Sequence, residues 1–309
     1  MNVAKIALSV ADVAALMGRR FDRVDEVELL TGGAWSSAFR VLAAGRPMVI
    51  KFGRYRDDYE RDALAGSWKL RTAPTPAVLE LGDAFGGYYT VMDWVAGDPF
   101  DALPSSRFVR ALDPLLDAYE ALAEVALPGS GFGIWVGPSG DAPCASWAEF
   151  LTSVPDRDDE RLRGWHDRLD AVPEARFVFD DAQHEIERIA ANCPNERCVN
   201  HGDPLQGNIL IDRRDNVSAL LDWGVSVVGD PLYDLAMLLF CVPWKPEIDG
   251  DRVRAEAKRR ADTADVEERL RASMLHIGVA ALQYQAFAGL PSDLAKTSGW
   301  MRSILAFRP

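Results

Sequence analysis

Cysteine and histidine are scarce in this sequence, which has four of each among its 309 residues. Four cysteines in a chain of this length do not make the dense disulfide framework of a small secreted protein. Cys193 and Cys198 lack both the two-residue spacing and the second pair of a typical zinc site. We therefore expect a fold without disulfides or zinc, in the reducing setting of the cytoplasm.

Long apolar runs and an excess of basic residues are also missing. A membrane-spanning helix needs about 20 apolar residues in a row, and the sequence has no such stretch. Nucleic-acid-binding surfaces are basic, whereas the net charge here is −13. We expect neither a membrane nor a nucleic acid as a partner. The acidity leaves two interpretations open: it steers a cationic substrate into a cleft, or it only keeps the protein in solution.

The N-terminal segment does not have the order of a secretory signal peptide. Asp12 interrupts its mildly apolar run, and most of its basic residues come at the end rather than at the start. We interpret residues 10–20 as a short helix of the folded protein.

The most informative stretch runs from 199 to 234. Two short apolar runs flank the polar turn DRRDN, and this pattern predicts a β-hairpin. Pairing Ile211 with Val217 brings Asn208 close to Asp222. An amide oxygen and a carboxylate at a hairpin mouth suit Mg²⁺, with nucleotide phosphates as further ligands. The alternative is an ordinary hairpin with polar ends.

Three motifs in this stretch follow one another in a characteristic order. Residues 201–208 read HGDPLQGN, residues 221–223 read LDW, and residues 229–236 read GDPLYDLA. The combination resembles the catalytic core of the aminoglycoside phosphotransferase family, whose members are related to protein kinases. The eukaryotic protein-kinase forms His-Arg-Asp and Asp-Phe-Gly are absent, which favours a kinase for a small molecule.

The resemblance implies an α+β, protein-kinase-like fold of two lobes. We expect a nucleotide-binding N-lobe over 1–95, with an antiparallel sheet and a helix. A larger, mainly helical C-lobe over 96–309 would carry the catalytic loop, the metal site and the substrate-binding helices. The implied cofactors are ATP, with GTP as the alternative, and Mg²⁺. Helical periodicity in the C-lobe is found over 106–126, 174–191, 230–242 and 252–287.

The chain ahead of the core has the order of a kinase N-lobe. A strand, a glycine-containing loop, a strand, a turn and a strand follow one another over 24–52. The loop over 31–37, which includes Ser36 and Ser37, would cover the ATP phosphates with backbone N–H groups; the alternative is a plain hairpin turn. Lys51 ends the last strand and would hold the α- and β-phosphates, unless it is only a solvated strand end.

Such a lysine needs a carboxylate that orients it. A predicted helix over 57–70 carries two candidates, of which Glu60 fits the family's acidic position and Asp62 is the second choice. The alternative is a surface network of helical i,i+4 pairs among Arg56, Asp57, Glu60 and Arg61.

The segment after the predicted strand over 88–92 occupies the place of the kinase hinge. There the backbone groups of Asp93 and Val95 would pair with the adenine, and Met92 would line the pocket. The alternative is a strand that simply leaves a sheet.

The resemblance also assigns roles within the core. Asp203 would accept, or at least orient, the proton of the acceptor hydroxyl, and Asn208 and Asp222 would hold one or two Mg²⁺ ions. We interpret His201 as structural, because the family match places the acceptor at Asp203 and an aspartate near its ordinary pKa is ionised at neutral pH.

The sequence indicates the acceptor substrate less specifically than it indicates the reaction. Stretches over 130–151, 233–244 and 270–278 resemble the hygromycin B phosphotransferases of the family, which implies transfer to a hydroxyl of an aminoglycoside and antibiotic resistance. Aromatic and acidic groups suit a small cationic polyamino sugar. The candidates are Asp234, Trp244 and Tyr284, whose alternatives are a loop-bracing role for Asp234, as for Asp230, and core packing for the two aromatics.

Two departures from that branch keep other acceptors open. Lys51 stands where the branch carries arginine, and Cys241 replaces one of a tryptophan pair whose other member is Trp244. The remaining hypotheses are a kinase for an amino alcohol, a sugar or a macrolide, and a nucleotide-binding pseudokinase. Retention of Lys51, Asp203, Asn208 and Asp222 speaks against the pseudokinase. We expect a monomer or a weak dimer.

Overall fold

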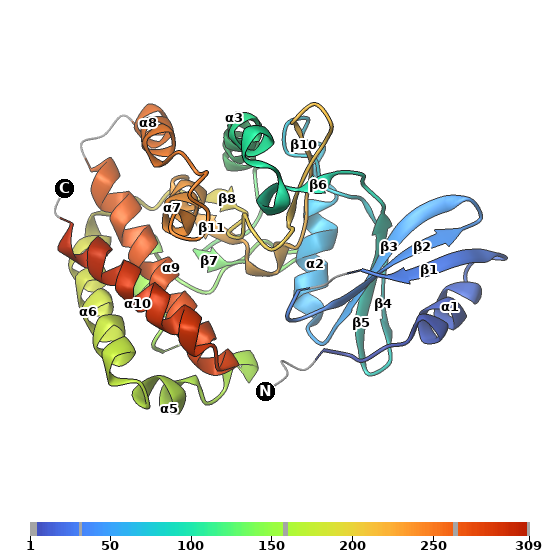
Figure 1. Cartoon of the computed structure of the whole chain (residues 1–309), viewed down its shortest axis with the longest axis horizontal. Coiled ribbons are helices and arrows are strands. Elements are labelled where there is room, and N and C mark those ends of the chain that lie inside the picture. Colours follow the sequence, from blue (N-terminus) through green and yellow to red (C-terminus); the bar gives the residue numbers. More distant parts are fainter. Residues whose placement is uncertain (1–4, 31–32, 157–159, 262–264, 308–309) are drawn as a thin grey trace.

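The computed structural model describes residues 5–30, 33–156, 160–261 and 265–307. Figure 1 shows two lobes: a sheet-containing lobe formed by the first part of the chain and a larger helical lobe formed by the rest. Thr31 and Gly32 of the predicted phosphate loop lie outside the described residues, as do residues 262–264 of the predicted helix over 252–287.

The N-lobe is built on a five-stranded antiparallel sheet of order β1-β2-β3-β5-β4. Alternate residues of β2 and β3 are buried, and they pack with Val13, Leu16 and Met17 of the first helix in one apolar cluster. A capping box at Ser9 begins that helix. The elements are α1 (Val10–Gly18), β1 (Val24–Leu29), β2 (Ser37–Ala43), β3 (Arg46–Gly53), α2 (Arg56–Ala65), β4 (Val78–Ala84) and β5 (Gly87–Asp93).

Helix α2 lies between the sheet and the C-lobe (Figure 1). It packs against the 3-10 turn η4 (Trp223–Val225) of the C-lobe as well as against β4 and β5. The helix ends at Ala65, short of the predicted end at residue 70. Helix α2 is therefore part of the contact between the lobes.

The C-lobe is mainly helical, as predicted, and α9 lies at its centre. Residues 269–279 of α9 are buried without interruption, because α5, α6, α7 and α10 pack around it. The helix predicted from residue 230 begins at Tyr233, after Pro231, and the segment predicted as one helix contains both α8 and α9. The helices are α3 (Ser105–Ala123), α4 (Trp147–Thr152), α5 (Trp165–Asp170), α6 (Pro173–Ile189), α7 (Tyr233–Cys241), α8 (Gly250–Arg260), α9 (Val266–Ala288) and α10 (Pro291–Ala306).

Two small sheets position the central stretch. The predicted hairpin forms, with Val217 opposite Ile211, but a bulge after Val217 shifts the register by one residue. The Asn208 carbonyl consequently accepts the N–H of Leu221 (2.8 Å). Asn208 is thus bonded to the residue that directly precedes Asp222. The strands are β6 (Asp98–Pro99), β9 (Ile209–Ile211) and β10 (Val217–Leu220) in one sheet, and β7 (Gly133–Ile134), β8 (Cys198–Asn200) and β11 (Val227–Gly229) in the other.

The predicted boundary between residues 95 and 96 falls in the connection between β5 and β6. Strand β5 ends the N-lobe sheet at Asp93, and β6 already pairs with β9 of the C-lobe. Among the described residues, no helix is long and apolar enough to cross a membrane.

Candidate active site

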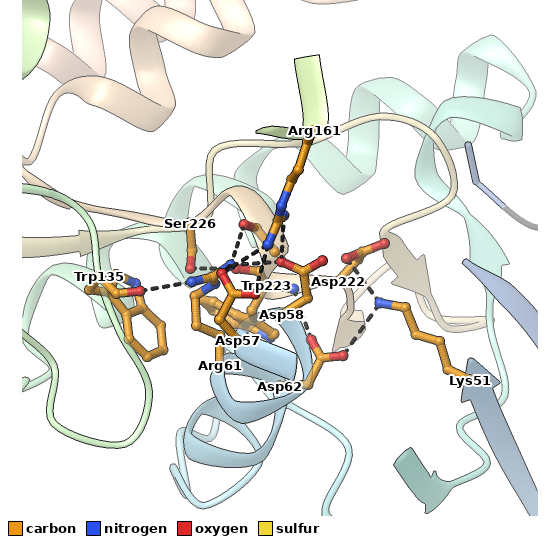
Figure 2. Close-up of polar contacts among 11 residues, drawn as sticks. Lys51, Asp57, Asp58, Arg61, Asp62, Trp135, Arg161, Asp222, Trp223 and Ser226 are labelled. Carbon is orange, nitrogen blue, oxygen red and sulfur yellow. Dashed lines mark hydrogen bonds and ion pairs between the residues drawn. The ribbon is translucent and has the colours of Figure 1, made fainter. Parts of the chain in front are cut away.

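Lys51 of β3 lies between two carboxylates at the junction of the lobes (Figure 2). Its Nζ is 3.3 Å from Oδ2 of Asp62 and 2.9 Å from Oδ1 of Asp222. Burial by itself disfavours the ammonium, but the two carboxylates outweigh it and raise the pKa of Lys51 above its ordinary value. The lysine is therefore a fixed positive charge between the two lobes.

The prediction that Glu60 orients Lys51 is wrong, and Asp62 takes that place. Glu60 instead accepts a hydrogen bond from Arg56 (2.7 Å). Residues two apart on an α-helix point about 200° apart, so Glu60 and Asp62 face different sides of α2. Asp62 is 5 % exposed, and its other oxygen accepts the N–H of Trp223 (3.0 Å). Burial raises the pKa of Asp62, and Lys51 offsets part of that rise.

His201 and Asp234 fix the backbone of the catalytic loop. The buried His201 ring is hydrogen-bonded through Nε2 to the Leu221 carbonyl (2.9 Å), and burial lowers its pKa. Asp234 accepts the N–H groups of His201 (2.8 Å) and Gly202 (2.7 Å), where Gly202 has a φ of +80°. Asp234 is 2 % exposed, so it braces the loop and does not line a substrate pocket. This bracing role corrects the prediction of Asp234 as a substrate contact.

Asp203 and Asn208 are joined directly. Nδ2 of Asn208 donates to Oδ2 of Asp203 (2.8 Å). Burial, together with the nearby charge of Asp222, raises the pKa of Asp203 to about 7. The turn between them is held by Asp101, whose carboxylate accepts the N–H of Gly207 (3.1 Å). This anchor was missed in the sequence, because nothing local marks a residue about a hundred positions upstream.

Asn208 and Asp222 offer oxygen donors of the kind that Mg²⁺ prefers. Because the Asn208 amide nitrogen is bound to Asp203, its amide oxygen is the atom available to a cation. Burial by itself would raise the pKa of Asp222, but Lys51 outweighs it and lowers that pKa, so the carboxylate stays ionised. Its side chain is 40 % exposed. Two protein ligands fit an ion that takes its other ligands from phosphates and water.

Of the predicted hinge residues, Met92 and Asp93 end β5 and Val95 follows it. Met92 is buried, whereas Asp93 and Val95 are half-buried. The Asp93 carboxylate forms an ion pair with Arg46 (2.5 Å), so its side chain is bound within the N-lobe. These positions are compatible with the predicted adenine site.

The described end of the phosphate loop leads into β2. Ser36 is buried, and the Ser37 hydroxyl donates to the Ile6 carbonyl (3.2 Å). The Ser37 side chain thus anchors the N-terminal segment, and a phosphate contact at this end of the loop would fall to backbone N–H groups.

The two aromatic substrate candidates are both half-buried. Trp244 stacks on Phe240 with a centroid distance of 5.6 Å, and the Lys296 ammonium lies 4.8 Å from the Trp244 ring centre. Tyr284 of α9 lies 6.2 Å from the Trp35 ring of the N-lobe loop. Trp244 can therefore accept a cation, and Tyr284 lies where the lobes meet.

An antiparallel N-lobe, a helical C-lobe and a lysine held between carboxylates beside an Asp203–Asn208 pair define a kinase-like phosphotransferase. Consistent with this class, the model of the phosphotransferase enzyme family, APH, matches residues 26–272. The chain belongs to that family, and the sequence-based predictions of family and fold are confirmed.

Similar proteins include aminoglycoside kinases. Hygromycin-B 4-O-kinase of Escherichia coli is 28 % identical over 298 residues, which cover 96 % of this chain and 85 % of that protein. A thermostable mutant of aminoglycoside phosphotransferase APH(4)-Ia, in a ternary complex with AMP-PNP and hygromycin B, has a TM-score of 0.82 at 26 % identity, covering 95 % of this chain and 97 % of that one. Its apo form has a TM-score of 0.81 at 26 % identity, covering 94 % and 98 %.

Proposed function

We propose that this protein is an ATP-dependent O-phosphotransferase that transfers the γ-phosphate to a hydroxyl of an aminoglycoside of the hygromycin B type. The observation that carries the proposal is the Asp203–Asn208 pair beside the Lys51–Asp222 pair. The complexes of APH(4)-Ia with nucleotide and hygromycin B support the choice of both substrates.

Each residue has a physical task in this reaction. Lys51 offsets charge on the α- and β-phosphates, and Asp62 holds it in place. Asn208 orients the Asp203 carboxylate, which accepts the proton of the attacking hydroxyl. When bound through Asn208 and Asp222, Mg²⁺ supplies positive charge to the phosphates. Because a loose phosphoryl transition state needs little covalent help, positioning and electrostatics carry most of the catalysis.

Charge and aromatic surface support a cationic acceptor. The net charge is −13, and the Trp244 ring already has an ammonium over it, that of Lys296. A cation over an indole face gains electrostatic attraction from the ring. We propose that Trp244 and Tyr284 contact the amino sugar. The cytoplasmic setting, the state as monomer or weak dimer, and a role in antibiotic resistance stay predictions.

The decisive experiment measures ADP release with purified protein, ATP and Mg²⁺ over a panel of acceptors. The panel contains hygromycin B, other aminoglycosides, a macrolide, an amino alcohol and simple sugars, and reactions without acceptor give the background ATPase rate. We expect hygromycin B or a related aminoglycoside to give turnover and a singly phosphorylated product by mass spectrometry. Turnover only with a non-aminoglycoside would replace the acceptor class, and no turnover with any acceptor would contradict the proposal.

A further inference from the structure

Arg61 of α2 is a buried guanidinium at the contact between the lobes. It is 2 % exposed, and it donates to the carbonyls of Trp135 (2.9 Å) and Gly224 (3.0 Å), which belong to two separate C-lobe segments. It also bonds Asp58 (2.7 Å) on its own helix. Arg61 does form the expected i,i+4 pair with Asp57 (3.1 Å), but it is not at the surface, because the C-lobe covers this face of α2.

The backbone of α2 is equally close to the C-lobe. A Cβ atom on Gly137 would lie 2.7 Å from the Glu60 carbonyl carbon and 2.9 Å from the Arg61 nitrogen. No side chain fits at Gly137, so the segment after Trp135 packs directly on the helix. Backbone contact and the Arg61 hydrogen bonds together join α2 to the C-lobe.

Arg161 joins the beginning of α2 to a further part of the C-lobe. It belongs to the 3-10 turn η2 (Glu160–Leu162), and its guanidinium bonds Asp57 (2.7 and 2.9 Å) and Asp58 (2.9 Å). Figure 2 shows Arg161 reaching these carboxylates from the side opposite Asp62 and Lys51. A planar guanidinium that meets two carboxylates at once fixes orientation more strictly than an ammonium does.

The same arginine also contacts an aromatic side chain that links it to the predicted phosphate loop. Its guanidinium carbon lies 3.9 Å from the Tyr55 ring centre. Tyr55 meets Trp35 edge-on at 6.3 Å, and Trp35 stacks on Phe287 of α9 at 6.2 Å. Arg161 therefore contacts both the start of α2 and an aromatic chain that links the N-lobe loop to the C-lobe.

One helical turn after Asp58, α2 carries Asp62, which contacts Lys51 of the proposed phosphate site. Asp62 directly follows Arg61, accepts the N–H of Trp223, and lies 3.3 Å from Lys51. A rotation of α2 would separate Asp62 from Lys51, because the Asp62 side chain can reach both partners from one helix orientation only. The C-lobe contacts of α2 therefore determine whether Lys51 is oriented.

We propose that Arg161 is a positioning residue for phosphoryl transfer. By holding Asp57 and Asp58 it sets the orientation of α2, and through α2 it keeps Asp62 against Lys51. The proposal rests on the proposed function in so far as Lys51 contacts the phosphates of a nucleotide. It goes beyond that function because it assigns the orientation of Lys51 to a C-lobe residue outside the proposed phosphate and metal contacts.

The test compares Arg161→Met, which removes the charge at similar length, with wild type. We expect kcat/KM for ATP and the affinity for AMP-PNP with Mg²⁺ to fall about tenfold, within the range of coupled networks, while KM for the acceptor is unchanged. Arg161→Lys should recover only part of the loss, because one ammonium cannot bond both carboxylates in the same geometry. Arg163→Met is the matched control, since Arg163 lies two residues away and its side chain is 78 % exposed.

A double-mutant cycle with Asp62→Asn separates positioning from plain stability. If Arg161 acts through Asp62, Arg161→Met will have little further effect on AMP-PNP affinity in the Asp62→Asn background. Additive effects, or wild-type affinity in Arg161→Met, would overturn the proposal. Because AMP-PNP binding needs no acceptor, the result is independent of which acceptor the panel identifies. Arg161 is mutated rather than Arg61 because removal of the buried Arg61 would destabilise the fold itself.

Discussion

Two clusters of charged side chains in this protein, one at the junction of the lobes and one behind the catalytic loop, are balanced differently. At the junction of the lobes, Lys51 faces Asp62 and Asp222, and burial together with the charge of Asp222 raises the pKa of Asp203. Behind the catalytic loop, Arg269 meets Asp230 through two hydrogen bonds (2.9 and 2.8 Å).

The difference distinguishes the candidate active site around Lys51 from the scaffold, by which we mean ion pairs such as Arg269–Asp230 that only support the fold. A matched buried ion pair gains little net free energy over an apolar pair, so the Arg269–Asp230 pair mainly specifies geometry. The carboxylates around Lys51 outnumber its single ammonium, and cations that bind there would offset their mutual repulsion. The proposed Mg²⁺ ion and cationic acceptor are such cations, so the predictions for this cluster concern activity and binding, whereas those for the scaffold concern stability.

The largest effect is expected from Asp203→Asn. The amide keeps the shape but cannot take a proton, so kcat should fall by about 10² to 10⁴, the usual worth of a general base. Nucleotide affinity should survive. Steady-state kinetics and AMP-PNP titration measure both quantities, and near-normal turnover would remove Asp203 from its role.

The scaffold should respond in stability rather than in chemistry. Arg269→Met leaves Asp230, which is 0 % exposed, without its partner, and we expect a loss of about 3–5 kcal/mol in the free energy of unfolding. Urea denaturation measures it. Addition of Asp230→Asn should recover part of the loss, and a stable single variant would show that this pair is not structural.

Asp222→Asn tests the surplus of carboxylates directly. With one proposed Mg²⁺ ligand weakened, the difference in AMP-PNP affinity between Mg²⁺ and EDTA should shrink by roughly tenfold or more. Calorimetry under the two conditions gives this ratio. An unchanged ratio would refute the metal assignment.

Asp62→Asn and Glu60→Gln form a matched pair on one helix. Loss of the Asp62 charge weakens the hold on Lys51, and we expect kcat/KM for ATP to fall about tenfold, as for other coupled charge pairs. Glu60 bonds only Arg56 among its described contacts, so Glu60→Gln should stay near wild type. The reverse pattern would restore Glu60 as the partner of Lys51.

The smallest effect that we expect concerns the pH dependence of the free energy of unfolding. Hydrogen bonds from Arg188, opposed by burial and aided by Arg271, lower the pKa of Glu185 from 4.5 to about 2. A lowered folded-state pKa gives stability that is present above the unfolded value and lost as pH falls from about 4.5 toward 2. Glu185→Gln should make the free energy of unfolding less dependent on pH over that window, whereas Glu187→Gln, on the exposed face of α6, should leave this dependence unchanged. Parallel curves for wild type and Glu185→Gln would contradict this linkage.

Local chemistry was enough to predict much of the fold. Apolar runs around DRRDN predicted the pairing of Ile211 with Val217, and the pattern before Lys51 predicted separate strands, whereas their antiparallel sheet was implied by the family resemblance. The register shift after Val217 was not predictable, because a bulge depends on how the hairpin packs. Helix α10 was missed in the same way, since α9 supplies most of the contacts that stabilise it.

The sequence by itself determined which groups are available for the reaction and their order along the chain. Asp203, Asn208 and Asp222 stand close together in sequence, so short-range folding brings them together. Tertiary structure alone decided which carboxylate meets Lys51, because Glu60 and Asp62 lie on different faces of α2 and the packing of α2 against the C-lobe selects the face that Lys51 meets. The orientation of α2 is set by C-lobe residues such as Arg161, about a hundred positions away, and a contact of that range leaves no signal in the local sequence pattern.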